Sequence, residues 1–199
     1  DAVHYAPHFS INVQELGCDF MLCSAYKFYG PHVSFLYSKP GLLGSLTTDR
    51  LVVQDQEAPY IIETGTQNHA ACSGVASAID FISSIGKGSS LREKLESAYK
   101  QISIHEFELA KHLYDSLQKE DKITVIGQDF SSKKRTPTVS FVHNDFSPQD
   151  VCKKLASKNI CAWDGHFYAL KAIQKLGLEQ AGGVTRLGVS LYNTKQEID

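Results

Sequence analysis

Two segments with helical spacing of apolar residues constrain this chain more than any other feature. In residues 68–85, Ile79 and Ile82 recur at helical spacing among many Ala, Ser and Gly residues, which predicts a buried, closely packed helix. In residues 91–117, apolar side chains recur on one face with a lapse near Glu106, which predicts a long amphipathic helix. Any fold for this chain must therefore pack a core against one face of a long helix.

Short apolar runs on both sides of these helices predict strands. Residues 41–60 lack periodicity and are expected to form an irregular loop. The expected strands are residues 20–23, 32–37, 122–126, 138–142, 160–163 and 184–192, and two further helices are expected at 148–157 and 167–176. Strand and helix thus alternate along the chain, which predicts an α/β architecture.

Composition and charge exclude several classes of function. The 199 residues are 42% hydrophobic and 21% charged, values typical of a globular chain with a core. The net charge of -2, with both signs interspersed, indicates no nucleic-acid partner, and the basic run Lys133–Arg135 is expected to be a solvated loop. No apolar run approaches the roughly 20 residues of a membrane helix. Five cysteines without paired metal-ligand spacing predict reduced thiols, no metal site and a cytoplasmic location.

Lys27 is the most informative candidate for chemistry. It follows the apolar run 20–23 and precedes Phe-Tyr-Gly-Pro at 28–31, a placement typical of a lysine that forms a Schiff base. Desolvation makes an amine nucleophilic, and residues 20–23 are expected to be a buried strand that leads into such a pocket. We interpret Lys27 as the anchor of pyridoxal 5'-phosphate. The alternative interpretation is a side chain that simply extends to the surface.

Other residues supply what this cofactor needs. Asp1 can keep the pyridine nitrogen protonated, so that the ring accepts electrons from a substrate carbanion. His4 can hydrogen-bond the ring hydroxyl, and Ser24 and Tyr26 offer hydroxyl groups to the phosphate. Arg186 carries the planar guanidinium fork that suits the carboxylate of an amino acid. Together these residues predict an enzyme with an amino-acid substrate.

These residues resemble motifs of the class V aminotransferase group of fold-type I pyridoxal phosphate enzymes, in particular its cysteine desulfurase-like members. Asp1–His4 resembles the signature Asp-x-x-(Gln or His), and Ser24–Lys27 resembles Ser-x-His-Lys with tyrosine in place of histidine. Gly65-Thr66 is similar to a segment that reaches the phosphate of the neighbouring subunit's cofactor. Arg186–Thr194 resembles a C-terminal stretch that ends in Tyr-Asn-Thr. The resemblance covers nearly the whole chain.

The resemblance implies a fold, a domain plan and an assembly. It implies the C-terminal half of a fold-type I transferase, because the family fold needs a much longer chain. Residues 1–90 would end the large cofactor domain and carry part of a mainly parallel sheet, residues 91–118 would form a connecting helix, and residues 119–199 a small α/β domain. The resemblance of Thr66 to the family's contact with a neighbouring subunit's phosphate implies a homodimer with active sites at its interface. His166 lies in the family's active-site stretch, which implies substrate binding.

One departure from the family pattern bears on the reaction. Desulfurases carry a cysteine nucleophile after Gly-His-His, whereas the corresponding stretch here is Gly165–Ala169, with Tyr168 at the cysteine position. A phenol cannot take sulfur as a persulfide. Cys161 is nearby in sequence, but it is expected to lie in a buried strand. We therefore expect transamination or β-elimination rather than desulfuration, with the role of Cys161 left open.

Two interpretations from other classes compete with this one. Ser24–Lys27 also matches the Ser-x-x-Lys of penicillin-binding proteins, in which serine attacks an acyl carbonyl, but the companion motifs Ser-Asp-Asn and Lys-Thr-Gly are absent from the sequence. The chain could instead be an association domain that keeps the fold without catalysis. A cofactor absorbance that borohydride abolishes would separate the enzyme from the association domain.

Overall fold

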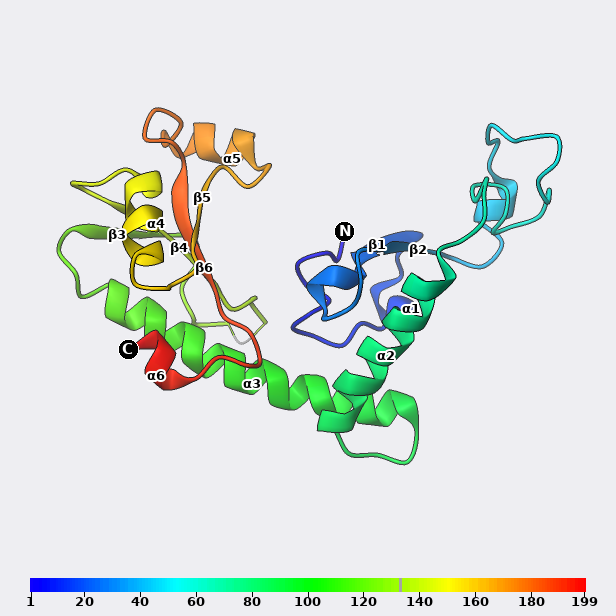
Figure 1. Ribbon diagram of the computed structural model, residues 1–199, viewed down its shortest axis with the longest axis horizontal. Coiled ribbons are helices and arrows are strands. Elements are labelled where there is room, and N and C mark those ends of the chain that lie inside the picture. The colour runs from blue at the N-terminus through cyan, green and yellow to red at the C-terminus, as the bar shows by residue number, and fades with distance from the viewer. Residues whose placement is uncertain (133) are drawn as a thin grey trace. The chain divides into compact units, whose positions relative to one another are not determined.

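The chain divides into two compact units, Asp1–Gln101 and Ile102–Asp199 (Figure 1). The computed structural model describes residues 1–132 and 134–199, so that Lys133, the first residue of the basic run, lies outside the described residues. Each unit has its own sheet, and the long helix α3 (Leu91–Leu117) contributes residues to both. Each unit therefore has its own sheet and its own packing.

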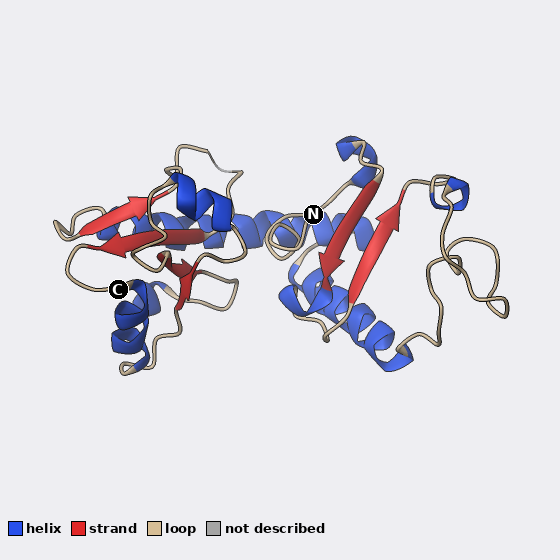
Figure 2. Ribbon diagram, turned by 90° about the horizontal axis from the view of Figure 1, so that it is seen from above, coloured by secondary structure: helices blue, strands red, loops and turns tan. Residues whose placement is uncertain are grey.

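The first unit contains an antiparallel strand pair. β1 (Phe20–Ser24) pairs with β2 (Ser34–Ser38), and Figure 2 shows the two arrows running in opposite directions. Met21 and Cys23 are buried, whereas Leu22 between them is exposed on the other face. The strand predicted at residues 20–23 is therefore present, but only one of its faces is buried in this chain.

This pairing corrects the expectation of a mainly parallel sheet in residues 1–90. Residues 25–33 join β1 to β2 and contain only the short 3-10 turn η1 (Ala25–Lys27). A parallel pair needs a crossover of about a dozen residues or more, so this link produces a hairpin. Every strand pair among the described residues is antiparallel. The α/β class is confirmed, but the prediction of parallel strands is wrong for the strands that the structure describes.

Helix α2 (His69–Ile85) packs closely against the hairpin, as its small residues predict. Its N-cap is Asn68, whose side chain accepts a hydrogen bond from the N–H of Ala71 at 3.0 Å. A Cβ atom added at Gly74 would lie 2.9 Å from Cγ of Pro31, so no side chain fits between helix and hairpin there. Before α2, the structure has the one-turn helix α1 (Val13–Leu16) and the 3-10 turn η2 (Leu43–Ser45), which lies in the predicted irregular segment 41–60.

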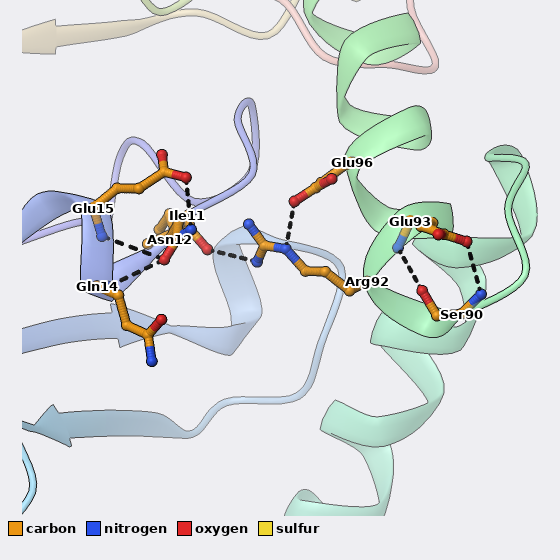
Figure 3. Close-up of polar contacts among 8 residues, drawn as sticks. All are labelled: Ile11, Asn12, Gln14, Glu15, Ser90, Arg92, Glu93 and Glu96. Carbon is orange, nitrogen blue, oxygen red and sulfur yellow. Dashed lines mark hydrogen bonds and ion pairs between the residues drawn. The ribbon is translucent and has the colours of Figure 1, made fainter.

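A capping box begins α3. The Glu93 carboxylate accepts a hydrogen bond from the N–H of Ser89 at 2.7 Å. It also accepts one from the N–H of Ser90 at 3.1 Å, and the Ser90 hydroxyl accepts one from the N–H of Glu93 at 3.2 Å (Figure 3). These bonds, above all those from Ser89, lower the pKa of Glu93 to about 2. The helix then runs without a break past Glu106, whose side chain is buried.

Arg92 links the start of α3 to the start of α1. Its Nη1 donates to the carbonyl oxygen of Ile11 at 2.8 Å, and its Nε donates to the Glu96 carboxylate at 2.6 Å (Figure 3). Ile11 precedes Asn12, the N-cap of α1, whose side chain accepts a hydrogen bond from the N–H of Gln14 at 3.1 Å. One exposed guanidinium thus joins two residues that are 81 positions apart and lie at two helix starts of the first unit.

The second unit is a four-stranded antiparallel sheet in the order β3-β4-β6-β5. The strand predicted at 160–163 begins only at Trp163, and the strand predicted at 184–192 ends at Gly188. The elements are β3 (Ile123–Ile126), β4 (Thr138–His143), α4 (Pro148–Ala156), β5 (Trp163–Gly165), α5 (Leu170–Lys175), β6 (Val184–Gly188) and α6 (Lys195–Ile198). Strand β6, between β4 and β5, is therefore covered by neighbours on both edges.

An apolar stripe of α3 forms the core of the second unit against this sheet. The ring of Tyr114 lies 5.3 Å from the ring of Phe130 between centroids, and the ring of Phe107 lies 5.4 Å from the same ring. Burying a large apolar side chain contributes about 1.5–3 kcal/mol. The buried cluster comprises Leu109, Ala110, Leu113, Tyr114, Phe130, Val139 and Val189.

Two histidines of α3 hold the segment that contains α6. His105 Nε2 lies 2.9 Å from the carbonyl oxygen of Asn193, and His112 Nε2 lies 2.5 Å from Oδ1 of Asp199. The hydrogen bond with His112, more than any other contact, lowers the pKa of Asp199. Polar contacts therefore join α3 to the C-terminal segment, in addition to the apolar contacts between α3 and the sheet.

The state of the cysteines and the hydropathy of the helices can be compared with what the sequence predicts. All five cysteines are free thiols, and burial raises the pKa of the Cys23 thiol. None of the helices in residues 1–132 and 134–199 has the combined length and hydropathy that crossing a bilayer requires.

The capping box predicts a pH-dependent stability. Because the pKa of Glu93 falls from 4.5 to about 2 on folding, its stabilising effect is present above 4.5 and is lost as pH falls toward 2. We expect Glu93→Gln to unfold at a lower temperature than the parent near neutral pH, with the difference shrinking as pH falls from 4.5 to 2. Thermal unfolding followed by circular dichroism measures this, with Glu108→Gln, exposed on the same helix, as control. A difference that stays constant with pH would contradict the assignment.

Candidate functional site

The turn that carries Lys27 is fixed by its backbone. The N–H of Ala25 donates to the carbonyl oxygen of Val33 at 2.8 Å, and the carbonyl oxygen of Ala25 accepts from the N–H groups of Phe28 and Gly30 at 3.0 and 2.9 Å. Ala25 and Phe28 are buried on either side of the lysine. Lys27 therefore leaves the end of β1 from a point that three hydrogen bonds hold in place.

The side chain of Lys27 is exposed in this chain, which corrects the expectation of a desolvated pocket within these residues. Its Nζ lies 6.0 Å from the centre of the Tyr26 ring. Within the described residues it forms no hydrogen bond or ion pair. The amine is thus fixed at its base and has no partner at its tip among the described residues.

Hydroxyl groups and an imidazole gather beside this lysine. The Oγ atoms of Ser24 and Ser34, which face each other across the hairpin, are 3.3 Å apart. The rings of Tyr26 and His32 stack with centroids 4.8 Å apart and planes 20° from parallel. Both hydroxyl residues predicted from the sequence thus lie near Lys27, Ser24 with a partner in β2 and Tyr26 with a partner in the link between the strands.

Helix α2 packs against the turn that carries Lys27. Gly74 contacts Pro31 at the end of the turn, and the ring of Tyr29 lies 5.9 Å from the ring of Phe81, edge to face. Tyr29 has a left-handed backbone with φ 71°, which is unusual for a residue with a side chain. The closely packed helix predicted from the small residues thus holds the turn of Lys27.

The segment that holds Asp1 and His4 lies beside β1. The N–H of Ala2 donates to the carbonyl oxygen of Leu22 at 2.9 Å, and Ala2 is buried. The Asp1 carboxylate accepts a hydrogen bond from the N–H of Val3 at 2.7 Å, and the ring of His4 meets the buried His8 ring edge to face at 5.7 Å. The structure therefore places this segment against the strand that leads to Lys27.

Gly65 and Thr66 lie apart from these groups. Both are exposed in an irregular segment between residues 62 and 68, before α2 begins. Gln67 donates from its side chain to the carbonyl oxygen of Gly65 at 3.5 Å, a contact within the segment itself. No hydrogen bond among the described residues joins them to the turn of Lys27.

Arg186 is the central candidate of the second unit. It lies on β6 between Ser140 of β4 and Trp163 of β5, which are its cross-strand partners. Its neighbours point the other way, because Leu187 packs against the core and the Thr185 hydroxyl donates to the carbonyl oxygen of Pro148 in α4 at 3.4 Å. Side chains alternate along a strand, so Arg186 emerges on the sheet face opposite α3 and α4.

One face of the Arg186 guanidinium is covered by the ring of Phe167, whose centre lies 3.9 Å from Cζ. Burial lowers the pKa of Arg186. Among the described residues, no acceptor receives a hydrogen bond from its guanidinium. Arg135 stacks on Phe130 at the same 3.9 Å, but it donates to backbone carbonyl oxygens, including that of Thr138 at 2.6 Å. Arg135 is thus a structural arginine, whereas the N–H donors of Arg186 have no acceptor among the described residues.

The turn that carries His166 and Phe167 has an unusual backbone. Phe167 and Tyr168 both have left-handed conformations, with φ 51° and 61°, which cost about 1–3 kcal/mol each for residues with side chains. The N–H of Tyr168 donates to Nδ1 of His166 at 3.2 Å, so His166 helps to hold the turn. A Cβ at Gly183 would lie 2.2 Å from the carbonyl oxygen of Gly165, so the two backbones touch.

Cys161 is exposed, which corrects the expectation that it lies in a buried strand. Strand β5 starts two residues later, so the apolar run around Cys161 is not paired in the sheet. Cys161 lines a cavity of about 730 Å³ together with Leu187 and with residues of α3 and α4. The thiol therefore lies on the α3 side of the sheet, whereas Arg186 lies on the opposite face. Tyr168 is fully exposed at the far end of β5.

The first unit thus has an amine with no partner among the described residues and hydroxyl groups beside it, and the second has a guanidinium without a described acceptor. No three His, Cys, Asp or Glu side chains gather to hold a metal ion among the described residues. The family model "Aminotransferase class-V" matches residues 1–199. The chain belongs to the class-V aminotransferase family.

Relatives and solved structures of this family match the whole chain. It is 33% identical to a "Probable cysteine desulfurase" of Halalkalibacterium halodurans and 31% identical to "Aminotransferase-like protein FGM3" of Gibberella zeae, covering 47% and 48% of these proteins. The cysteine desulfurase of Thermococcus onnurineus matches with TM-score 0.77 at 25% identity, and the cysteine desulfurase CsdA of Escherichia coli with TM-score 0.80 at 24% identity, and the chain covers 48% of each. The chain spans about half the length of the relatives that it matches.

Three residues beside the class-V motifs were not found from the sequence. Ser34 follows from the hairpin register, which places it opposite Ser24 once β1 and β2 are known to pair. His32 stacks on Tyr26 only because the turn brings it back to the end of β1. Phe167 reaches Arg186 through a left-handed backbone that no sequence pattern signals in a residue other than glycine.

The contact between Gly165 and Gly183 predicts a difference between two neighbouring substitutions. Gly182 and Gly183 both have left-handed backbones, with φ 84° and 93°, but a Cβ at Gly182 would meet nothing within 4 Å. We expect Gly182→Ala to cost about 1 kcal/mol from its backbone alone, and Gly183→Ala to cost at least about 3 kcal/mol because it also separates the two backbones. Urea unfolding measures both. Equal losses of unfolding free energy in the two variants would show that the close approach of Gly165 and Gly183 does not contribute to stability.

Proposed function

We propose that the protein is a pyridoxal phosphate-dependent enzyme that acts on an amino acid. The observation that carries the proposal is Lys27, an amine without a described partner on a fixed turn, in a segment that resembles the family's Ser-x-His-Lys signature. On this proposal, residues 1–90 belong to a large cofactor domain and residues 119–199 form a small domain. Residues 91–118 form the helix that connects the two. Five free thiols support a reducing compartment such as the cytoplasm.

The residues around Lys27 fit the cofactor. Lys27 would hold its aldehyde carbon, and Ser24 and Tyr26 would donate hydroxyl hydrogen bonds to its phosphate. Asp1 would keep the ring nitrogen protonated, and His4 would hydrogen-bond the ring hydroxyl. When bound, the cofactor supplies an electron sink for the bonds at the substrate's α-carbon. Freed by the substrate, the Lys27 amine would move the proton at that carbon.

Arg186 would fix the substrate through its carboxylate. A guanidinium offers two parallel N–H donors to a carboxylate, and no described residue occupies those of Arg186. His166 would face the same substrate, since its Nδ1 accepts from Tyr168 and leaves Nε2 to donate in the neutral ring. The substrate would therefore be oriented by groups of one turn and one strand.

We propose transamination or β-elimination rather than sulfur transfer. Relatives of this chain carry the name cysteine desulfurase, and sulfur transfer needs an exposed thiolate at the substrate. Tyr168 stands at the position of the family's cysteine. Cys161 is exposed, but the cavity that it lines lies on the sheet face opposite Arg186. A substrate held by Arg186 would thus be separated from this thiol by the sheet.

Removing Lys27 tests the cofactor assignment. In the full-length protein we expect Lys27→Ala to fold but to retain no cofactor after borohydride treatment, because no other amine replaces the fixed one. Lys39→Ala, an exposed lysine at the other end of the hairpin, should fix as much cofactor as the parent. Absorbance after gel filtration measures both. Fixed cofactor in Lys27→Ala would overturn the assignment and favour an association domain.

Sulfide release tests the choice of reaction. We expect the full-length protein, incubated with cysteine and a reductant, to release at least about tenfold less sulfide than a desulfurase assayed alongside it. Cys161→Ser should leave turnover of the protein's own amino-acid substrate unchanged, as should Cys72→Ser, an exposed cysteine of the first unit. Rapid sulfide release that disappears only in Cys161→Ser would restore the desulfurase assignment.

We also propose a two-fold homodimer. Gly65 and Thr66 are exposed and make no hydrogen bond to the turn of Lys27 in this chain, which suits a segment that reaches a neighbouring subunit's phosphate. Analytical ultracentrifugation of the cofactor-loaded full-length protein should show a dimer, and Thr66→Ala should weaken cofactor retention about tenfold. A monomer with full cofactor occupancy would rule out the shared site.

A further inference from the structure

We propose that Phe167 positions Arg186, and that its ring turns the edge of the guanidinium toward the carboxylate of the substrate. The inference rests on the proposed function, because it takes Arg186 as the carboxylate-binding group. It adds to the site a residue that contacts Arg186 rather than the substrate.

The position of the ring is built into the backbone. Phe167 and Tyr168 hold two successive left-handed conformations, which chains adopt only where the surroundings impose them. The surroundings here are the hydrogen bond from the N–H of Tyr168 to Nδ1 of His166 at 3.2 Å and the contact of the Gly165 backbone with Gly183. Gly183 lies three residues before Arg186 on the same stretch of chain. The turn and the arginine are thus fixed to each other by backbone.

The ring limits how Arg186 can be approached. Phe167 covers one face of the guanidinium at 3.9 Å, and the sheet neighbours Ser140 and Trp163 flank the side chain on either side. The N–H donors lie in the guanidinium plane, so stacking leaves them free. Arg135 on Phe130 has the same stacking, but backbone carbonyl oxygens take its donors. The same device therefore serves structure at Arg135 and ligand binding at Arg186.

Two substitutions separate the ring from the backbone. Asparagine tolerates the left-handed conformation, so Phe167→Asn removes the ring and keeps the turn, whereas Phe167→Tyr keeps both. The probe is propionate, a carboxylate without an amine, titrated into the cofactor-loaded full-length protein while the Nε–Hε resonance of Arg186 is followed by NMR. Arg186→Lys assigns this resonance. We expect Phe167→Asn to shift it and to raise the propionate Kd about tenfold, and Phe167→Tyr to leave both within twofold. With the true substrate, KM should rise in Phe167→Asn while kcat changes less than twofold.

The outcomes separate this inference from the proposed function. Unchanged propionate binding in Phe167→Asn overturns the positioning role and leaves the carboxylate role of Arg186 intact. A parent protein whose Arg186 resonance ignores propionate, while Lys27 still fixes the cofactor, overturns the inference together with the substrate assignment. If Phe167→Asn does not fold, nuclear Overhauser effects between the Phe167 ring and Arg186 in the parent decide, and their absence overturns the inference.

Discussion

The packing of α3 against one face of the four-stranded sheet decides where the chemistry of the second unit can lie. Leu109, Leu113 and Tyr114 bury that face together with Val139, and α4 adds to the same side through Pro148. Because side chains alternate along β6, covering Leu187 leaves Arg186 on the open face. The position of this half-buried guanidinium on the open face is thus a consequence of the core. The same division places Cys161 with the core side, away from the arginine.

In the first unit the corresponding constraint is the hairpin that ends in the turn of Lys27. Ala25 and Phe28 anchor the turn in the interior, and α2 closes on it where Gly74 meets Pro31. The lysine is therefore fixed at its base and open at its tip. In both units a candidate side chain of the proposed site emerges from backbone that is held tightly, which favours a precise position for that side chain. The chain belongs to the class-V aminotransferase family.

Periodicity predicted the helices best, because α2 and α3 repeat one apolar face over many turns. The nearness of Ser24 and Tyr26 to Lys27 follows from the sequence, since they are contiguous, whereas their role toward a cofactor stays a prediction. The antiparallel direction of β1 and β2 was not predicted, because it depends on the short link between the two strands rather than on their composition. The exposure of Cys161 was missed because the apolar run of four residues at 160–163 resembles a buried strand whether or not it is paired. The contact of Phe167 with Arg186 depends on a backbone conformation that sequence patterns do not encode.

The central claim is that one lysine holds the cofactor. It is tested most directly by reducing the cofactor-loaded full-length protein with borohydride, digesting it, and locating the pyridoxyl group by peptide mass spectrometry. The account predicts a single modified peptide with the group on Lys27, at the end of β1. A group on a different lysine, or a protein that carries no modified peptide, would contradict the account, since every role assigned to the neighbouring residues follows from that attachment.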